Sequence, residues 1–358
     1  MAKVARLPHS DMRVGIYTHY AHCDQAYLCI RLVDFLRSRG VDFSIYADNQ
    51  PGKLRIPYDS AVSYKNVIKF TDWAKKQTAI VWTHVPKLEQ INYANRIGKL
   101  TVLAPMWQEL VPPFRKAMQR ADNVVALTME CLELYRDVYK VKNTAFIPFD
   151  AGLPPTRKEK RVDGKNVRIL LPWFDRNARC ANSDFLSALA YLLERMPDAQ
   201  LTVAITSSRF APAIAKFFQS LGRKTKGRVT LLRNVPLQKR PLLYADHDLT
   251  LYPGECDNYG VCGLTSINCG TPVLSFALSP QADFVYQDAN GVLVKTKTDY
   301  DENGVPHAAS DYSDLMETLQ TLIAEPWHID NLNKRITYNI VTRRKLFEQG
   351  WQTVLQIA

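Results

Sequence analysis

The fold is decided by the stretch YPGECDNYGVCGLTSINCGTPVLSF, residues 252–276. It reads as the end of one β-strand, a glycine-containing turn, a short helix, a break at CGTP and a second apolar strand. A helix between two strands joins them in parallel, and ligands of such sheets bind where the strands end at their carboxyl side. The turn carries Glu255, Asp257 and Asn258 just before the helix. The stretch therefore predicts an α/β fold with a binding loop.

The same alternation extends over the rest of the chain. One strand–helix–strand unit consists of the strand RVGIYTHY, the helical run AYLCIRLVDFLRSRG and the strand VDFSIYAD. Further units follow as far as NTAFIPF. A second series runs from VRILLPW to GVLV, and the two are separated by DAGLPPTRKEKRVDGKN, which is rich in proline, glycine and charge. We therefore predict two doubly wound, Rossmann-like domains facing a central cleft, at residues 1–152 and 153–335, followed by a C-terminal helix at 336–358.

Charge is distributed unevenly along the 358 residues. Residues 151–240 contain 18 basic and 6 acidic residues, within a total net charge of +11. This asymmetry indicates a surface that attracts a polyanion. Ordinary solvated lysine and arginine in surface loops explains the same count equally well.

Other features exclude several classes of protein. The seven cysteines include no C-x-x-C pair, which argues against a disulfide framework and a zinc site. The start of the sequence lacks the apolar core of a signal peptide, and no run approaches the roughly 20 apolar residues of a membrane span. We expect a cytoplasmic protein without integral membrane association and without a bound metal.

Two arginines follow the first strand of the second series. Arg176 and Arg179 come directly after VRILLPW, where a guanidinium group binds a diphosphate with two parallel hydrogen bonds. The alternative is a surface loop in which these arginines pair with Asp175 and Asp184.

The turn at the start of the quoted helix offers complementary groups. Backbone N–H groups of Tyr259, Gly260 and Val261 at a helix start face an anion or a hydroxyl oxygen, and Asp257 and Asn258 supply acceptors for sugar hydroxyls. This combination suits a phosphorylated sugar. Asp257 or Asn258 acting only as the cap of the helix remains an equally good explanation of the local pattern.

These residues carry a resemblance to a known family. ADHDLTLYPGECDNYGVCGLTSINCGTPVLSF, followed by ANGVLV, resembles the donor-binding signature of retaining GT-B glycosyltransferases, which runs E-G-F-G-L-x-x-x-E-A-x-A-C-G-T-P-V with a later N-G-x-L-V. Aligned on the shared G-T-P-V, the first glutamate of the signature falls on Asp257 and the second on Thr265. Asp257 is a methylene shorter than glutamate and Thr265 carries no charge, so the chain departs from the family at both positions.

The resemblance implies a retaining transfer of a sugar from a nucleotide-sugar co-substrate, with a UDP-sugar favoured. Leaving-group charge is then stabilised by the two arginines and the helix N-terminus, and the departing phosphate takes the proton of the acceptor. The implied roles are donor binding by Arg176, Arg179, Glu255, Asn258, Tyr259, Gly260, Val261 and Thr265, catalysis by Asp257, His84 and His22, and acceptor contacts by His19, Asp24 and Trp107. The first domain is expected to bind the acceptor and the second the donor, with the last helix packing back on the first.

The acceptor stays open at this level. The basic central segment favours DNA carrying a hydroxymethylated base, as in phage enzymes that glycosylate their own genomes and must flip the base out of the duplex. A lipid-linked or cell-surface glycan at an anionic membrane fits the same charge. A non-catalytic nucleic-acid-binding or sugar-binding relative that has lost activity is a third possibility, and Thr265 is its main support.

Overall fold

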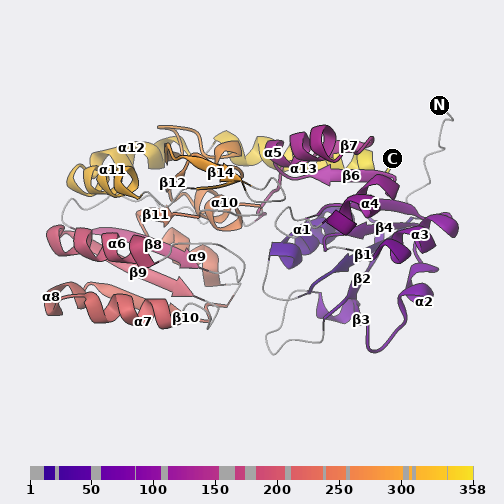
Figure 1. The fold of residues 1–358 in the computed structure, drawn as a ribbon, viewed down its shortest axis with the longest axis horizontal. Helices are drawn as coiled ribbons and strands as arrows, with labels where there is room; N and C mark the ends of the chain where they lie inside the picture. The colour runs from indigo at the N-terminus through magenta and orange to yellow at the C-terminus, as the bar shows by residue number, and fades with distance from the viewer. Residues whose placement is uncertain are drawn as a thin grey trace. The chain divides into compact units, whose positions relative to one another are not determined.

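A computed structural model gives the fold of the chain (Figure 1). It describes residues 12–20, 24–49, 58–84, 86–105, 112–152, 166–173, 183–205, 211–236, 239–254, 259–300, 306–308, 312–336 and 338–357. The chain divides into two compact units. Unit 1 comprises residues 1–151 and 341–358, and unit 2 comprises residues 152–340.

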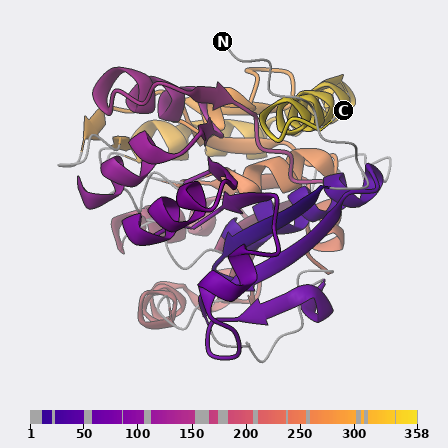
Figure 2. The ribbon, with the colours of Figure 1, turned by 90° about the vertical axis from the view of Figure 1, so that its right-hand side faces the viewer.

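Unit 1 contains a seven-stranded parallel sheet in the order β3-β2-β1-β4-β5-β6-β7. Its strands are β1 (Arg13–Thr18), β2 (Asp42–Ala47), β3 (Val62–Tyr64), β4 (Ala79–Trp82), β5 (Leu100–Leu103), β6 (Asn123–Ala126) and β7 (Thr144–Phe146). Its helices are α1 (Asp24–Ser38), α2 (Phe70–Ala74), α3 (Leu88–Arg96), α4 (Pro112–Arg120), α5 (Met129–Glu133) with a π-turn at Leu134–Val138, and α13 (Tyr338–Val354). Figure 2 shows these strands with helices on both faces of the sheet.

The core of unit 1 follows from the apolar patterns of the sequence. β1 is buried over every residue but its first, as expected of a central strand covered on both faces. The predicted apolar stripe of α1 is confirmed, because Leu28, Leu32, Phe35 and Leu36 are all buried. Strand β3 was not predicted. Its three residues are only half-buried and lie at the edge of the sheet, so they carry little apolar signal.

Unit 2 contains a six-stranded parallel sheet in the order β10-β9-β8-β11-β12-β13. Its strands are β8 (Val167–Trp173), β9 (Ala199–Ile205), β10 (Val229–Arg233), β11 (Leu249–Tyr252), β12 (Val273–Phe276) and β13 (Gly291–Val294), and a separate hairpin joins β14 (Thr298–Tyr300) to β15 (Pro306–Ala308). Its helices are α6 (Ser183–Arg195), α7 (Ala211–Ser220), α8 (Arg223–Lys226), α9 (Arg240–Ala245), α10 (Val261–Asn268), α11 (Ser313–Ala324) and α12 (Trp327–Arg335). Two doubly wound, Rossmann-like α/β sheets are thus present, as the sequence predicts.

The C-terminal helix α13 joins unit 1 through packing and through charge. Gly350 lies so close to the strand end after β7 that a Cβ atom would be 2.8 Å from Cγ1 of Ile147. The Arg343 side chain donates to the main-chain oxygen of Phe149 at 2.6 Å. These contacts place α13 against the segment that leaves the sheet after β7.

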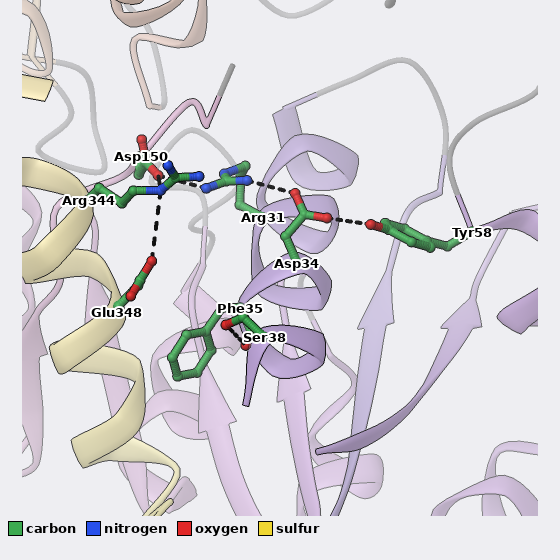
Figure 3. A network of polar contacts seen from close by, with 8 residues as sticks. All are labelled: Arg31, Asp34, Phe35, Ser38, Tyr58, Asp150, Arg344 and Glu348. Carbon is green, nitrogen blue, oxygen red and sulfur yellow. Dashed lines mark hydrogen bonds and ion pairs between the residues drawn. The ribbon is translucent and has the colours of Figure 1, made fainter. Parts of the chain in front are cut away.

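A buried carboxylate extends this connection to α1 (Figure 3). Nη2 of Arg31 lies 2.8 Å from Oδ2 of Asp150, and both side chains are almost fully buried. Nη1 of Arg31 also contacts Asp34 at 2.6 Å. On the other side of Asp150, Nε of Arg344 lies 3.9 Å from the same Oδ2 and 3.8 Å from Glu348. Asp150 therefore ties α1, the end of the first chain segment and α13 together within unit 1.

Candidate functional site

Each sheet has a point where the strand order reverses, and this is where ligands of doubly wound sheets bind. In unit 1 the reversal falls between β1 and β4, and in unit 2 between β8 and β11. The predicted site residues follow these same strands. His19 follows β1, His84 lies just beyond β4, the two arginines of the sequence prediction follow β8, and the quoted turn follows β11.

In unit 2, the turn after β11 is shaped around a glycine. Gly260 precedes α10 in the left-handed conformation, with φ of 68°. A Cβ atom there would overlap the ring of Phe284, and at Gly263, one turn further on, it would lie 2.9 Å from Cε2 of the same ring. The ring of Phe284 therefore occupies space that is free only because both positions lack a Cβ atom. This packing fixes the start of α10.

Helix α10 is buried along its whole length. Its backbone hydrogen bonds begin with the amide of Leu264, which donates to Gly260 O at 2.8 Å. The amide groups of a first helical turn point out of the N-terminal end, where the helix dipole favours an anion. Tyr259 and Thr265 are buried at 2% and 3% exposure. The N-terminal end of α10 thus lies just after the carboxyl end of β11, and its role in donor binding stays a prediction.

Several predicted site residues lie outside the described part of the chain. These are His22, Trp107, Arg176, Arg179, Glu255, Asp257 and Asn258. Their roles stay predictions.

In unit 1, the structure brings two predicted histidines onto one carboxylate. Nδ1 of His19 lies 3.1 Å from Oδ1 of Asp48, and Nε2 of His84 lies 3.0 Å from Oδ2 of the same group. The two imidazole rings are 5.9 Å apart between centroids. Asp24, also predicted, is the first residue of α1, and its neighbour Gln25 places Nε2 of its side-chain amide 3.4 Å from Nδ1 of His84. Asp48 therefore organises both imidazoles at the reversal of the sheet.

Asp48 was missed by the sequence analysis, although a signal was present. It directly follows the apolar strand β2 in the run VDFSIYAD, at the carboxyl end where polar residues bind ligands. His84 occupies a comparable position after the apolar run AIVW. A single aspartate after a strand also begins turns, so the position of Asp48 alone does not identify it as a site residue.

The two histidines change the pKa of the Asp48 carboxyl. Burial on its own would raise the pKa of the Asp48 carboxyl, but hydrogen bonds from His19 and His84 and the positive charge of both rings outweigh it. The pKa of Asp48 is therefore held well below its usual range, and the group is ionised at neutral pH. Tyr17 lies in the neighbouring strand β1. Burial raises its pKa to about 12, so this phenol is neutral at neutral pH.

Hydrogen bonds fix the three loops that carry the cluster. Oγ1 of Thr83 donates to Oγ1 of Thr18 at 2.7 Å, linking the ends of β4 and β1. The loop after β1 is joined to the loop after β2 by two bonds between Tyr20 and Asn49, at 2.7 and 3.0 Å. The cluster is thus held in place on three adjacent strands.

Two kinds of feature are absent from the described residues. No group of three or more His, Cys, Asp or Glu side chains there is arranged to hold a metal ion. Within the same residues, none of the helices is both long enough and apolar enough to cross a membrane.

Solved structures share this architecture over nearly the whole chain. HepE from Anabaena, in complex with UDP-glucose, is 13% identical, with a TM-score of 0.71 over 96% of this chain and 99% of HepE. Sucrose-phosphate synthase from Thermosynechococcus elongatus is 15% identical, with a TM-score of 0.66 over 96% of each chain. The chain has the GT-B fold of two Rossmann-like domains.

Sequence similarity is more limited. No family model matches the chain. A stretch of 108 residues is 27% identical to D-inositol 3-phosphate glycosyltransferase from Xylanimonas cellulosilytica. This match covers 30% of the chain and spans only 26% of the relative's length.

Proposed function

We propose that the protein is a glycosyltransferase that uses a nucleotide-sugar donor, with a UDP-sugar favoured. The observation that carries this proposal is the turn at Gly260, which opens α10 at the reversal point of unit 2 and belongs to the donor-binding signature. The fold it shares with HepE, whose structure contains UDP-glucose, supports the same conclusion.

On this proposal, unit 2 binds the donor. The start of α10 and the guanidinium groups of Arg176 and Arg179 stabilise the diphosphate, both in the bound donor and as it departs. Asp257, with Asn258 and Glu255 near it, binds the hydroxyls of the sugar, and Thr265 lies on the ribose side. The departing phosphate takes the proton of the acceptor hydroxyl, and transfer proceeds with retention.

Unit 1 then binds the acceptor and supplies side chains to the transfer step. His19 and His84 form hydrogen bonds with hydroxyl groups of the acceptor. Asp48 acts as a positioning residue that fixes the orientation of both rings. Asp24, His22 and Trp107 lie on the same side in this proposal.

For the acceptor, we extend the proposal to a hydroxymethylated base in DNA. Support comes from exposed basic side chains of unit 2 on α7, α8 and β10, which are Lys216, Arg223, Lys224, Lys226 and Arg233. A surface of this kind attracts a polyanion. Transfer to a lipid-linked or cell-surface glycan is the alternative acceptor, since an anionic membrane attracts the same charges.

The test is to incubate the protein with a panel of UDP- and GDP-sugars and to measure released nucleotide, with and without hydroxymethylated DNA. Release from a UDP-sugar is expected, and it should increase when the correct acceptor is added. If nucleotide release does not change with DNA but increases with a glycan acceptor, the proposal of a DNA acceptor is contradicted, whereas the proposal of sugar transfer is not. No release from any donor would contradict the transfer proposal.

A further inference from the structure

A pocket lies in unit 2, beside the edge strand β13. It has a volume of about 390 Å³, within the range of roughly 300–1,000 Å³ that is typical of ligand sites. Residues of β13, α11 and α12, with Asp288 before the strand, form its walls, and α11 and α12 lie side by side in Figure 1. Its lining contains one tryptophan, three aliphatic side chains and six polar ones: Trp327, Val292, Leu322, Leu332, Asp288, Thr318, Thr321, His328, Asn331 and Arg335.

The pocket is separate from the donor-binding turn. Asp288 precedes β13, so it lies at the amino end of that strand. Gly260 follows the carboxyl end of β11, and β11, β12 and β13 are parallel neighbours. The two sites therefore lie at opposite ends of the sheet.

An exposed aromatic ring stands at the rim of the pocket. Trp327, the first residue of α12, is 55% exposed, which leaves much of the indole in contact with water. His328 stacks on the indole with centroids 3.5 Å apart, and its Nε2 lies 3.0 Å from Glu325. The imidazole thus supports one side of an indole whose remaining surface is available to a ligand.

The polar groups around this ring supply both donors and acceptors. Nη1 of Arg335 donates to the main-chain oxygen of Asp288 at 3.0 Å, which holds the guanidinium at the pocket. The hydroxyls of Thr318 and Thr321 donate to carbonyls of their own helix at 2.8 and 3.1 Å, so their oxygens remain acceptors for a ligand. The floor is apolar, because Leu322 and Leu332 are buried.

The charge of the lining selects among ligand classes. One carboxylate, Asp288, is balanced by one guanidinium, Arg335. Such a balance gives little attraction for a nucleoside diphosphate or a nucleic acid, which require an excess of positive charge. A flat aromatic face beside closely spaced hydroxyl, amide, carboxylate and guanidinium groups matches the alternating C–H and O–H surfaces of a sugar ring.

We propose that this pocket is a binding site for a neutral saccharide unit, separate from the site of transfer. Trp327 packs against the face of the sugar ring, and Asp288, Asn331 and Arg335 bind its hydroxyls. The proposal rests on the pocket itself and does not depend on the transfer reaction, so a failure of donor turnover leaves it intact.

The test is saturation-transfer NMR of the whole chain with maltotriose and, separately, cellotriose. Transfer to at least one of them is expected in the wild type. It should weaken at least tenfold in Trp327→Ala and also in Asp288→Asn, which tolerates the left-handed φ of 59° at that position. The control is Tyr191→Ala, which removes another exposed helical aromatic of unit 2 outside the pocket and should bind as the wild type does.

Three results would overturn the proposal. One is the absence of transfer to either trisaccharide in the wild type. Another is equal transfer in wild type, Trp327→Ala and Asp288→Asn, with all three melting at the same temperature. The third is displacement of the trisaccharide by UDP, which would place it in the donor-binding site.

Discussion

The two units differ in what fixes the residues at the point where the strand order reverses. Charged hydrogen bonds do so in unit 1, and close packing does so in unit 2. In unit 1, His19 and His84 share the ionised carboxylate of Asp48 beyond the strand ends. In unit 2, the described residues at the equivalent place are a left-handed Gly260 and the aromatic ring that packs on it. The same topology thus positions ionisable side chains in one unit and backbone amides in the other.

The difference extends to the structure that supports each site. Helix α10 is anchored by uncharged hydrogen bonds. Oγ of Ser266 donates to the main-chain oxygen of Thr271 at 2.7 Å and lies 2.7 Å from Oγ1 of Thr250, from which it accepts. Unit 1 instead uses a buried carboxylate, Asp150, to join α1 to the segment after β7. Loss of charge should therefore damage the support of the site in unit 1, and loss of space should damage the start of α10 in unit 2.

The largest effect is expected for Asp150→Asn. Arg31 is almost fully buried, and the substitution removes the more deeply buried of its two carboxylate partners and leaves only Asp34. Breaking a buried ion pair typically costs about 3–5 kcal/mol. Denaturant unfolding of the variant measures this loss. The matched control is Asp72→Asn, whose exposed pair with Lys75 at 3.5 Å should contribute no more than about 1 kcal/mol. Equal losses in the two variants would remove the distinction between buried and surface charge in unit 1.

Gly260→Ala should have the next largest effect. The left-handed backbone costs a residue with a Cβ about 1–2 kcal/mol, and overlap with Phe284 adds about 1–3 kcal/mol. Gly98→Ala is the control, because its φ of 70° is nearly the same but no atom lies within 4 Å of the added Cβ. Unfolding measurements should show only the backbone cost at Gly98. If both variants lose the same stability, shape at the donor turn is not decisive.

Asp48→Asn should lower turnover while preserving the fold. Charge-assisted hydrogen bonds of this kind contribute about 1.5–3 kcal/mol, which corresponds to a turnover lower by about 10–150-fold if both imidazoles act in the reaction. The KM for the donor should not change, because the cluster lies in unit 1. Steady-state kinetics with a UDP-sugar provides the measurement. Unchanged kcat would mean that the cluster only stabilises its loops.

The smallest effect is a pH dependence of stability. Because the pKa of Asp48 is lowered in the folded protein, its ionisation stabilises the fold above the unfolded value of about 3.9, and this contribution is lost as pH falls through the folded pKa. The stability difference between wild type and Asp48→Asn should therefore shrink below about pH 4. A difference that is the same at pH 5 and pH 3 would contradict the assignment.

The sequence predicted the features that depend on periodicity and short motifs. Alternating strands and helices gave both sheets, and the glycine before VCGL gave the start of α10. Asp48 was missed because its two partners are 29 and 36 positions away in the chain, and only the strand order brings them together. The buried pair of Arg31 and Asp150 was missed for the same reason, since 119 positions separate them.

The central claim is that unit 2 binds the nucleotide and unit 1 serves the transfer, and calorimetric titration of UDP tests it most directly. Wild type and Asp48→Asn should bind UDP with the same affinity, whereas Arg176→Ala should bind about 10–150-fold more weakly, because it loses a charge-assisted contact of about 1.5–3 kcal/mol. Failure of the wild type to bind UDP, or equal affinity in all three proteins, would contradict the account.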